Sequence, residues 1–406
     1  MLFTFVILFL TLGCDLAYGQ GEEGNEKEEV MVTLDFSKKG AFGLKNNTSQ
    51  SVLTNITFKV QDLSVSLYGM TCHFEGTNTY LRLDGNNNNN PGQISISVPN
   101  PAVIKSATLG TNRYKITNLH AKYTYNGKEK DEEISVKANK TATVSSINSN
   151  NVSFIEKGSD QSFITTITLT ITRPKLDATL DEKAFDAEST IKGIVGENKT
   201  LALNRTFNPS QLYTMCLPFD LSKDMITEIF GNETKVYSYD GCQNGELSFS
   251  IVKEVKAGMP FLMRSEYYVE QPTFADVTVR STSAQTVCGG EWDLCGTFGS
   301  YELAADGTQL FLIADGTLAK PKVGSQKMRG FRCYLKKAAG TANASAQLPS
   351  VTIDGETNAI KTAEYAAPTS GTTAYSLSGM KLNAGCKTAN GGIMIIDGKK
   401  FITTNR

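Results

Sequence analysis

The chain has 406 residues, which is enough for two or three domains. Its 40 Lys and Arg balance 41 Asp and Glu, so the net charge is -1 and the chain lacks the cationic excess that holds a protein to nucleic acid. Hydrophobic residues make up 40% of the sequence and charged residues 20%, a composition that buries a core and excludes a globally disordered chain.

An apolar run opens the chain. Residues 1–12 carry no charged side chain, but the run is shorter than the roughly 20 residues that span a bilayer. Small residues follow at Ala17 and Gly19, as in a secretory signal peptide. We therefore expect a signal peptide over 1–19, cleaved after Gly19, with Gln20 as the first residue of the mature chain.

An alternative cleavage before Cys14 would produce a lipoprotein, because residues 12–14 (LGC) resemble part of a lipobox. An acidic linker is expected over 20–30. No later segment is apolar enough to span a membrane. The sequence therefore predicts a protein that is secreted or held on the outer cell surface and does not span the membrane after processing.

Residues 31–173 alternate between apolar and polar side chains, the pattern of strands with one face in a core and one in water. Ser and Thr supply many of the polar positions, and Thr favours a pleated backbone. The alternation is clearest in 32–36 (VTLDF), 63–67 (LSVSL), 94–98 (ISISV) and 167–172 (ITLTIT). Asn126 and Gly127 predict a type I′ hairpin turn. This region is expected to form a β-sandwich resembling a jelly roll.

A linker is expected over 174–194, followed by a second β-rich domain over 195–356. One short helix is predicted in it, over 223–230, because Ser222 can cap its start and Gly231 can end it. A second linker over 357–371 and a small strand unit over 372–406 complete the expected fold, which is all-β.

Seven segments of the second half form an ordered pattern that resembles a module of exported proteins from Bacteroidetes, especially Prevotella-like bacteria. They are 201–207 (LALNRTF), 212–220 (LYTMCLPFD), 255–263 (VKAGMPFLM), 298–301 (FGSY), 310–312 (LFL), 328–334 (MRGFRCY) and 351–356 (VTIDGE). In the tail, 374–381 (AYSLSGMK) and 392–400 (GIMIIDGKK) resemble the C-terminal sorting regions of type IX secretion cargo. The resemblance implies a surface or secreted protein and no particular activity.

Catalytic chemistry finds little support in the sequence. The chain has only two histidines, His73 and His120, and a His-based triad needs an imidazole beside a nucleophile. Cys72 is adjacent to His73, but neighbours on a strand point to opposite faces. Glu291 and Asp293 are a candidate carboxylate pair for glycoside hydrolysis. The interpretation we favour is a protein without catalytic residues, cofactor or metal.

Aromatic side chains on a β-sandwich are candidate platforms for sugar rings. The candidates are Tyr80, Tyr114, Tyr123, Tyr125 and the single tryptophan, Trp292; aromatic residues in strands also commonly pack in the core. Among eight cysteines, Cys288 and Cys295 are close enough in sequence to form a disulfide that closes a short loop.

The function predicted from the sequence is therefore non-catalytic binding outside the cell, with a glycan or the host extracellular matrix as partner. Two alternatives remain: a structural component of the cell envelope without a small ligand, and a glycan-cleaving enzyme.

Overall fold

The computed structural model describes most of the chain up to residue 358 and four short strands beyond it. The described residues are 26–44, 56–75, 78–85, 91–209, 211–321, 327–339, 348–354, 356–358, 374–376, 381–382, 393–396 and 399–402. The predicted signal peptide and both cleavage positions, at Gln20 and Cys14, lie outside these residues. The chain forms two compact units, Met1–Asn358 and Ala359–Arg406.

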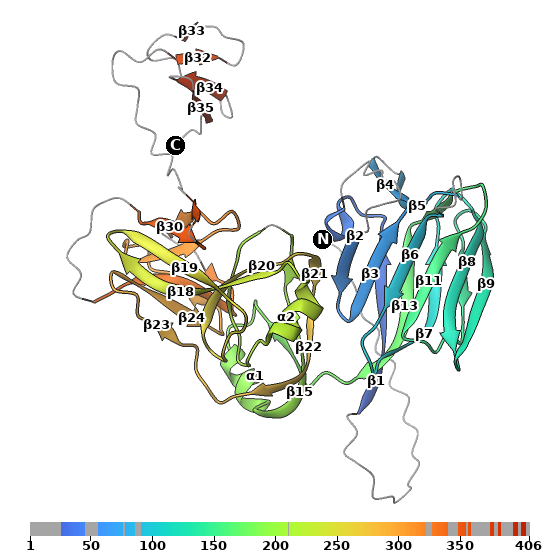
Figure 1. The fold of residues 1–406 in the computed structure, drawn as a ribbon, viewed down its shortest axis with the longest axis horizontal. Coiled ribbons are helices and arrows are strands. Elements are labelled where there is room, and N and C mark those ends of the chain that lie inside the picture. The colour runs from blue at the N-terminus through green and yellow to red at the C-terminus, as the bar shows by residue number, and fades with distance from the viewer. Residues whose placement is uncertain are drawn as a thin grey trace, which may run out of the picture. The chain divides into compact units, whose positions relative to one another are not determined.

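The fold is all-β, as the sequence predicts: the described residues form many strands and only two α-helices (Figure 1). Two sheets enclose the first core. One has the order β1-β13-β7-β10, with β1 at Lys27–Asp35, β13 at Thr166–Pro174, β7 at Val103–Gly110 and β10 at Thr141–Val144. Strand β1 begins inside the segment expected to be an acidic linker, so only the part before Lys27 can serve as one.

The other sheet has eight strands in the order β16-β21-β2-β3-β6-β11-β8-β9. The bounds are Thr206–Phe207, Tyr268–Glu270, Ile56–Val60, Leu63–Tyr68, Gln93–Ser97, Asn151–Glu156, Ile116–Tyr125 and Lys128–Val136 in that order. A three-stranded sheet of β12 (Ser162–Ile164), β5 (Asn78–Leu83) and β4 (Met70–Glu75) completes the first region.

Alternating burial explains why these strands form. In β13 every second side chain is buried, and Ile167, Leu169 and Ile171 are fully enclosed. Burying such a side chain contributes about 1.5–3 kcal/mol, while the intervening Thr residues stay half exposed. The predicted turn is confirmed, because Asn126 and Gly127 have φ of 50° and 71° and connect β8 to β9.

The second core uses residues from Leu180 to Phe331. A sheet of order β14-β15-β22 consists of Ala178–Asp181, Gly196–Asn204 and Thr273–Val279. A second, β17-β20-β18-β19-β30-β31, consists of Tyr213–Cys216, Pro260–Arg264, Lys235–Gln243, Glu246–Val252, Ser350–Ile353 and Glu356–Asn358. A third, β23-β24-β29-β26-β27, consists of Thr286–Val287, Trp292–Thr297, Arg332–Lys337, Gln309–Leu312 and Leu318–Ala319. Tyr301–Glu302 (β25) pairs with Lys327–Met328 (β28).

The predicted helix is present as α2, Lys223–Phe230. The Ser222 side chain accepts a hydrogen bond from the backbone N–H of Met225, and Gly231 ends the helix with φ of 107°.

The structure corrects the expectation of a linker over 174–194. That segment contains β14 and a second helix, α1 (Ala187–Gly193), where the Asp186 side chain accepts a hydrogen bond from the backbone N–H of Ser189. Leu180 and Ile191 are buried in the second core. The segment is rich in charged residues, and its apolar side chains are too few to show a period, which is why the pattern did not reveal it.

Strand β21 connects the two cores. Its residue Val269 is buried in the second core, while its backbone runs parallel to β2 at the edge of the eight-stranded sheet. The pairing places Lys59 of β2 opposite Val269. Helix α2 and strand β22 therefore lie beside the end of β2.

The C-terminal unit contains a separate sheet of order β33-β32-β34-β35. Its strands are Lys381–Leu382, Ala374–Ser376, Ile393–Ile396 and Lys399–Ile402. The last two pair antiparallel. Apart from residues 357 and 358, the predicted linker over 357–371 lies outside the described residues.

A buried carboxylate holds the former linker segment in place. Glu182 lies between three arginines, with Arg329 Nη1 at 2.5 Å, Arg332 Nη2 at 2.7 Å and Arg205 Nε at 3.6 Å from its oxygens. The side chains of Glu182 and Arg205 are only 5% and 2% exposed. Burial alone would raise the pKa of Glu182, but Arg332, Arg329 and Arg205 together hold it below its usual value.

We expect Glu182→Gln to lower the free energy of unfolding by about 3 kcal/mol, because it leaves Arg205 buried without its counter-charge. Since the pKa of Glu182 is lowered in the folded state, its stabilising effect is present above the usual pKa of 4.5 and is lost as the pH falls below it. Urea unfolding between pH 7 and pH 3 measures both effects. The variant should lose less stability on acidification than the wild type.

Glu197→Gln, at an exposed position of β15, is the matched control and should behave as wild type. Equal acid sensitivity of Glu182→Gln and the wild type would contradict the proposed role of this carboxylate.

Candidate functional site

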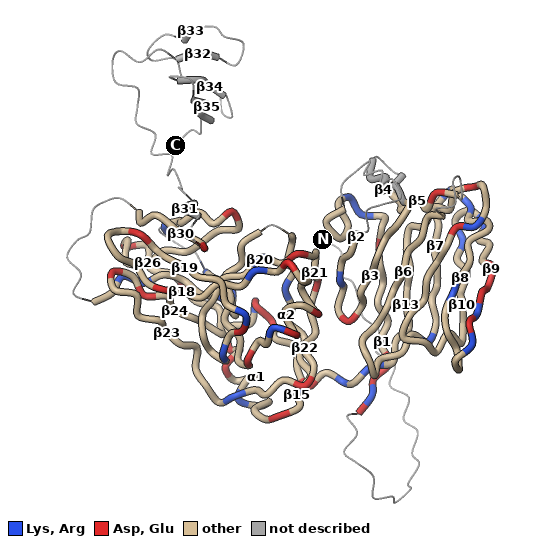
Figure 2. The backbone as a smooth tube through the Cα atoms, viewed as in Figure 1, with Lys and Arg blue, Asp and Glu red and all other residues tan. Residues whose placement is uncertain are grey.

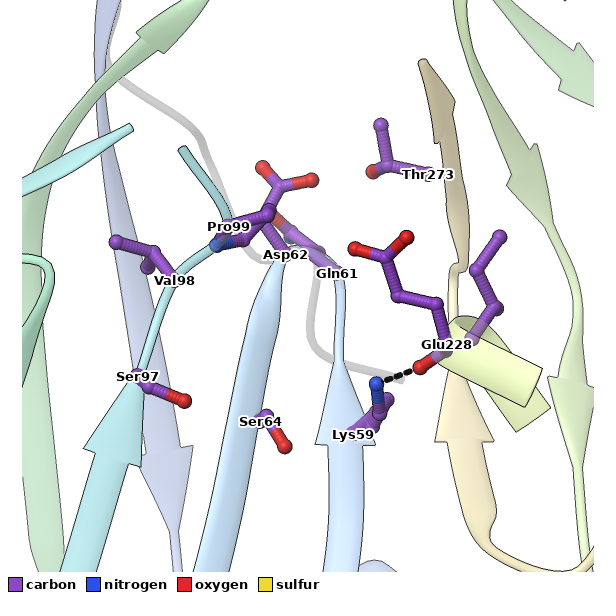
Figure 3. Close-up of a pocket in the computed structure, with 10 residues that line it drawn as sticks. Lys59, Gln61, Asp62, Ser64, Ser97, Val98, Pro99, Glu228 and Thr273 are labelled. Atoms are coloured by element: carbon purple, nitrogen blue, oxygen red, sulfur yellow. Dashed lines mark hydrogen bonds between the residues drawn. The ribbon is translucent and has the colours of Figure 1, made fainter. Parts of the chain in front are cut away.

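A cavity of about 290 Å³ lies where β2 and β6 end and β3 begins, near α2 and β22 (Figure 3). Seven of the ten lining residues carry a hydroxyl, amide, carboxylate or ammonium group, and the other three are apolar. The lining residues are Lys59, Gln61, Asp62, Ser64, Ser97, Val98, Pro99, Glu228, Ile229 and Thr273. A concave space with a few convergent polar groups is the usual form of a small-molecule site.

Strand register places three of the polar groups side by side. Lys59 of β2 is opposite Ser64 of β3, and Ser64 is opposite Ser97 of β6. Because opposite residues on neighbouring strands share a face of the sheet, these three side chains form a row that points away from the first core. Gln61 and Asp62 follow in the turn after β2, where Gln61 has φ of 53°.

Helix α2 closes the cavity on the other side. Lys59 Nζ donates a hydrogen bond to the backbone carbonyl of Glu228, in the last turn of the helix, where the helix dipole favours a cation. Burial lowers the pKa of Lys59, and the nearby Glu228 carboxylate opposes that shift. Figure 3 shows the Glu228 carboxylate pointing from the helix toward Gln61 and Asp62.

An ion pair with Arg173 holds the Asp62 side chain in place. Its Oδ2 lies 2.5 Å from Nη1 of Arg173, and both side chains are 9% exposed. Arg173 Nε also donates to Glu28 at 2.9 Å, and the two carboxylates together raise the pKa of Arg173 despite the opposing effect of burial. The cavity thus has one anchored carboxylate, Asp62, and one exposed carboxylate, Glu228. Such a set can donate and accept hydrogen bonds around a hydroxylated ligand.

The predicted aromatic platforms are only partly available. Tyr123 and Trp292 are buried, with 6% and 7% exposure, so neither can stack on a ligand. Tyr123 donates to Glu132, and Tyr125 is half-buried against the first core.

Tyr80 and Tyr114 come together with Phe163, which is not among the predicted platforms. The ring of Tyr114 stacks on that of Phe163 at 4.6 Å, and Tyr80 meets both edge-on at 5.5 and 5.0 Å. Arg113 covers the Tyr114 ring at 4.9 Å. The three rings are half-buried and pack against one another. The cluster therefore stabilises the three-stranded sheet and does not present a flat platform.

The candidate catalytic carboxylates have structural roles. Glu291 accepts hydrogen bonds from the backbone N–H of Gly245, and Asp293 accepts one from Gly289. His120 Nδ1 lies 2.7 Å from Oδ1 of Asp131. The side chains of Cys72 and His73 lie outside the described residues. No group of three or more His, Cys, Asp or Glu among the described residues could hold a metal ion.

The structure has Cys288 and Cys295 as free thiols, so it does not contain the predicted disulfide. Strand register gives the reason. Cys295 is opposite Thr286 in the β23–β24 pair, which leaves Cys288 beyond the paired residues and exposed while Cys295 packs against Tyr334. Burial raises the pKa of Cys295, which lowers its reactivity further.

Comparisons with known proteins identify no relative. No family model matches the chain, and no curated protein matches it. A mutant of CBM29-2, a family 29 carbohydrate binding module, is similar at 11% identity over 34% of this chain and 90% of that one. The TM-score of 0.19 is too low for this likeness to bear on fold or function. Within the described residues, no helix has the length and apolar character needed to cross a membrane.

We expect Cys288 to react with iodoacetamide in the native protein and Cys295 to react only after unfolding, because only Cys288 is exposed. Peptide mapping of the non-reduced protein by mass spectrometry measures both sites separately. A peptide pair linked through Cys288 and Cys295 would contradict the structure.

Proposed function

We propose that this chain is a non-catalytic exported protein that binds a glycan, with one saccharide unit held in the cavity between β2 and α2. The observation that supports this is the lining of the cavity. Lys59, Gln61 and Glu228 offer donors and acceptors at short range, and Pro99 and Ile229 supply apolar surface. A sugar ring matches both features, because it has hydroxyl groups around its edge and C–H groups on its faces.

Charge argues against other small ligands. A phosphate or nucleotide would meet the carboxylates of Asp62 and Glu228, and Lys59 already donates to a backbone carbonyl. An apolar ligand would cover hydroxyl and carboxylate groups without replacing their hydrogen bonds to water, which costs free energy. A neutral polyhydroxylated ligand replaces those bonds directly.

Binding without turnover is favoured over hydrolysis by the state of Asp62. Glycoside hydrolysis needs one carboxyl that donates a proton and a second that acts as base or nucleophile. Asp62 is committed to its 2.5 Å ion pair with Arg173, so Glu228 is left without a second free carboxylate in the cavity. A glycan-cleaving activity would therefore need residues outside this site.

Export and a surface location are part of the same proposal and rest on the sequence. The apolar run at 1–12, the small residues Ala17 and Gly19, and the resemblance of the tail to sorting regions support it. Extracellular glycans are the polyhydroxylated ligands that such a protein would encounter, and a glycan of the host matrix belongs to the same class.

We expect Glu228→Gln to weaken glycan binding about tenfold, because it replaces a charge-assisted hydrogen bond with a neutral one. A glycan array identifies the ligand, and calorimetry compares the variant with the wild type. The melting temperature should not change, since Glu228 is exposed.

The control is Glu197→Gln, which makes the same chemical change far from the cavity lining. Absence of binding to every glycan on the array would contradict the proposed function and favour an envelope component. Release of reducing sugar by the wild-type protein, abolished by one Asp or Glu substitution, would favour the enzyme.

We expect the exported protein to begin at Gln20 when its N-terminus is sequenced. A lipid-modified Cys14 at the N-terminus would instead indicate a lipoprotein on the cell surface. An unprocessed chain retained in the cytoplasm would contradict export altogether.

A further inference from the structure

The outward side of four neighbouring strands in the eight-stranded sheet carries small polar side chains in register. Thr57 of β2 is opposite Ser66 of β3, Ser66 is opposite Ser95 of β6, and Ser95 is opposite Ser153 of β11. We call this row and its two neighbours the hydroxyl face. The neighbouring rows are Lys59, Ser64, Ser97 and Asn151 on one side, and Tyr68, Gln93 and Ile155 on the other.

Hydrogen bonds orient the central row. Oγ1 of Thr57 lies 3.2 Å from Oγ of Ser66, and Oγ of Ser95 lies 2.9 Å from Oγ of Ser153. Gln93 donates to Ser95 at 2.6 Å. Each hydroxyl has one donor hydrogen and two acceptor positions, so these contacts leave binding capacity on every one of them. The row is half-buried and therefore still reached by solvent.

The hydroxyl face is uncharged over its central strands. Strands β3 and β6 contain no charged residue, and both are tan along their length in Figure 2. The acidic residue of β11, Glu156, is buried on the opposite side of the sheet. Charge enters at the cavity end, with Lys59, and beyond β11, where Ser153 is opposite the exposed Lys122 of β8, which is 3.8 Å from Asp131.

The face is continuous with the cavity. Lys59, Ser64 and Ser97 belong both to a row of the face and to the cavity lining. At the opposite end, Tyr68 is 37% exposed and offers an aromatic surface, and Gln93 lies between it and Ile155. A chain that leaves the cavity and crosses the neighbouring strands would therefore meet the hydroxyls of β3, β6 and β11 in turn.

We propose that the hydroxyl face binds an extended neutral polysaccharide chain, of which the cavity holds one unit. The inference rests on the proposed function and extends it from one saccharide unit to a polymer. The hydroxyls of the face suit those of a sugar, because a sugar hydroxyl can replace each water that is hydrogen-bonded to the face. A charged polymer would find no counter-charge on β3, β6 or the exposed side of β11.

The spacing of the strands also fits a polymer of sugars. Neighbouring strands are about 4.8 Å apart, which is close to the length of one pyranose unit along its chain. Successive units lying across β2, β3, β6 and β11 would therefore meet equivalent hydroxyls. Affinity should rise with oligosaccharide length until the four strands are covered.

The test uses the mature protein and a panel of neutral polysaccharides: glucans, mannans, xylans and galactans. The polysaccharide that binds best is then compared with its own oligosaccharides of increasing length by calorimetry. The variant Ser66→Ala/Ser95→Ala/Ser153→Ala removes the central hydroxyls. We expect it to bind the longer oligosaccharides about tenfold more weakly and the monosaccharide as tightly as the wild type.

A matched control exists on the other sheet. Thr33 of β1 and Thr168 of β13 form the same kind of cross-strand hydroxyl pair, at 3.0 Å, and Thr33→Ala/Thr168→Ala should leave binding unchanged. If the triple variant does not fold, as judged by circular dichroism, Ser95→Arg blocks the face at a single half-buried position and should give the same loss.

The possible outcomes separate this inference from the proposed function. Monosaccharide binding with no gain from chain length would overturn the polysaccharide face and leave the cavity site standing. A length dependence that persists in both face variants would overturn it as well. No binding to any glycan would overturn both proposals. Dimers that become monomers in the face variants would show that a second copy of the chain occupies the face instead.

Discussion

The pairing of β21 with β2 is the contact on which the candidate site depends. Strand β2 would otherwise be the edge of its sheet, with unpaired N–H and C=O groups. Strand β21 satisfies them with its backbone while its side chain at Val269 is buried in the second core. This pairing brings the end of α2 to Lys59 and so forms a wall of the cavity. The cavity is thus a product of two cores that meet through backbone hydrogen bonds.

Much of the fold could be predicted because local pattern decides it. Alternation in β13, the Asn126-Gly127 turn and the capped helix α2 each depend on residues within a few positions of one another. The structure of segment 174–194 could not be predicted in this way, since Glu182 is held by Arg329 and Arg332, which are about 150 residues away in the chain. The charged side chains of this segment predicted that it is exposed to solvent, because their ion-pair partners are distant in the sequence and come close only in the folded chain.

The candidate site could not be predicted from the sequence for a different reason. Large aromatic residues are the sequence signal for a sugar platform, yet Tyr123 and Trp292 are buried because strands bury their most apolar side chains. The polar groups that converge at the cavity are common residues such as Ser64 and Gln61, whose types alone carry no signal. Their juxtaposition with Glu228 follows from strand register and from the β2–β21 pairing, and neither can be read from local pattern.

The other edge of the eight-stranded sheet, at β9, disfavours the addition of a strand, in contrast to β2. Strand β9 ends the described sheet, and its first six residues, Lys128 to Glu133, are all exposed and all charged. A strand from another molecule that paired with this edge would have to bring its own side chains beside these charges, which disfavours the addition. Strand β2 therefore pairs with β21 of the same chain, whereas the charges on β9 disfavour pairing with a strand of another molecule. At high local concentration, the charges on β9 would keep neighbouring copies from joining through this edge into aggregates.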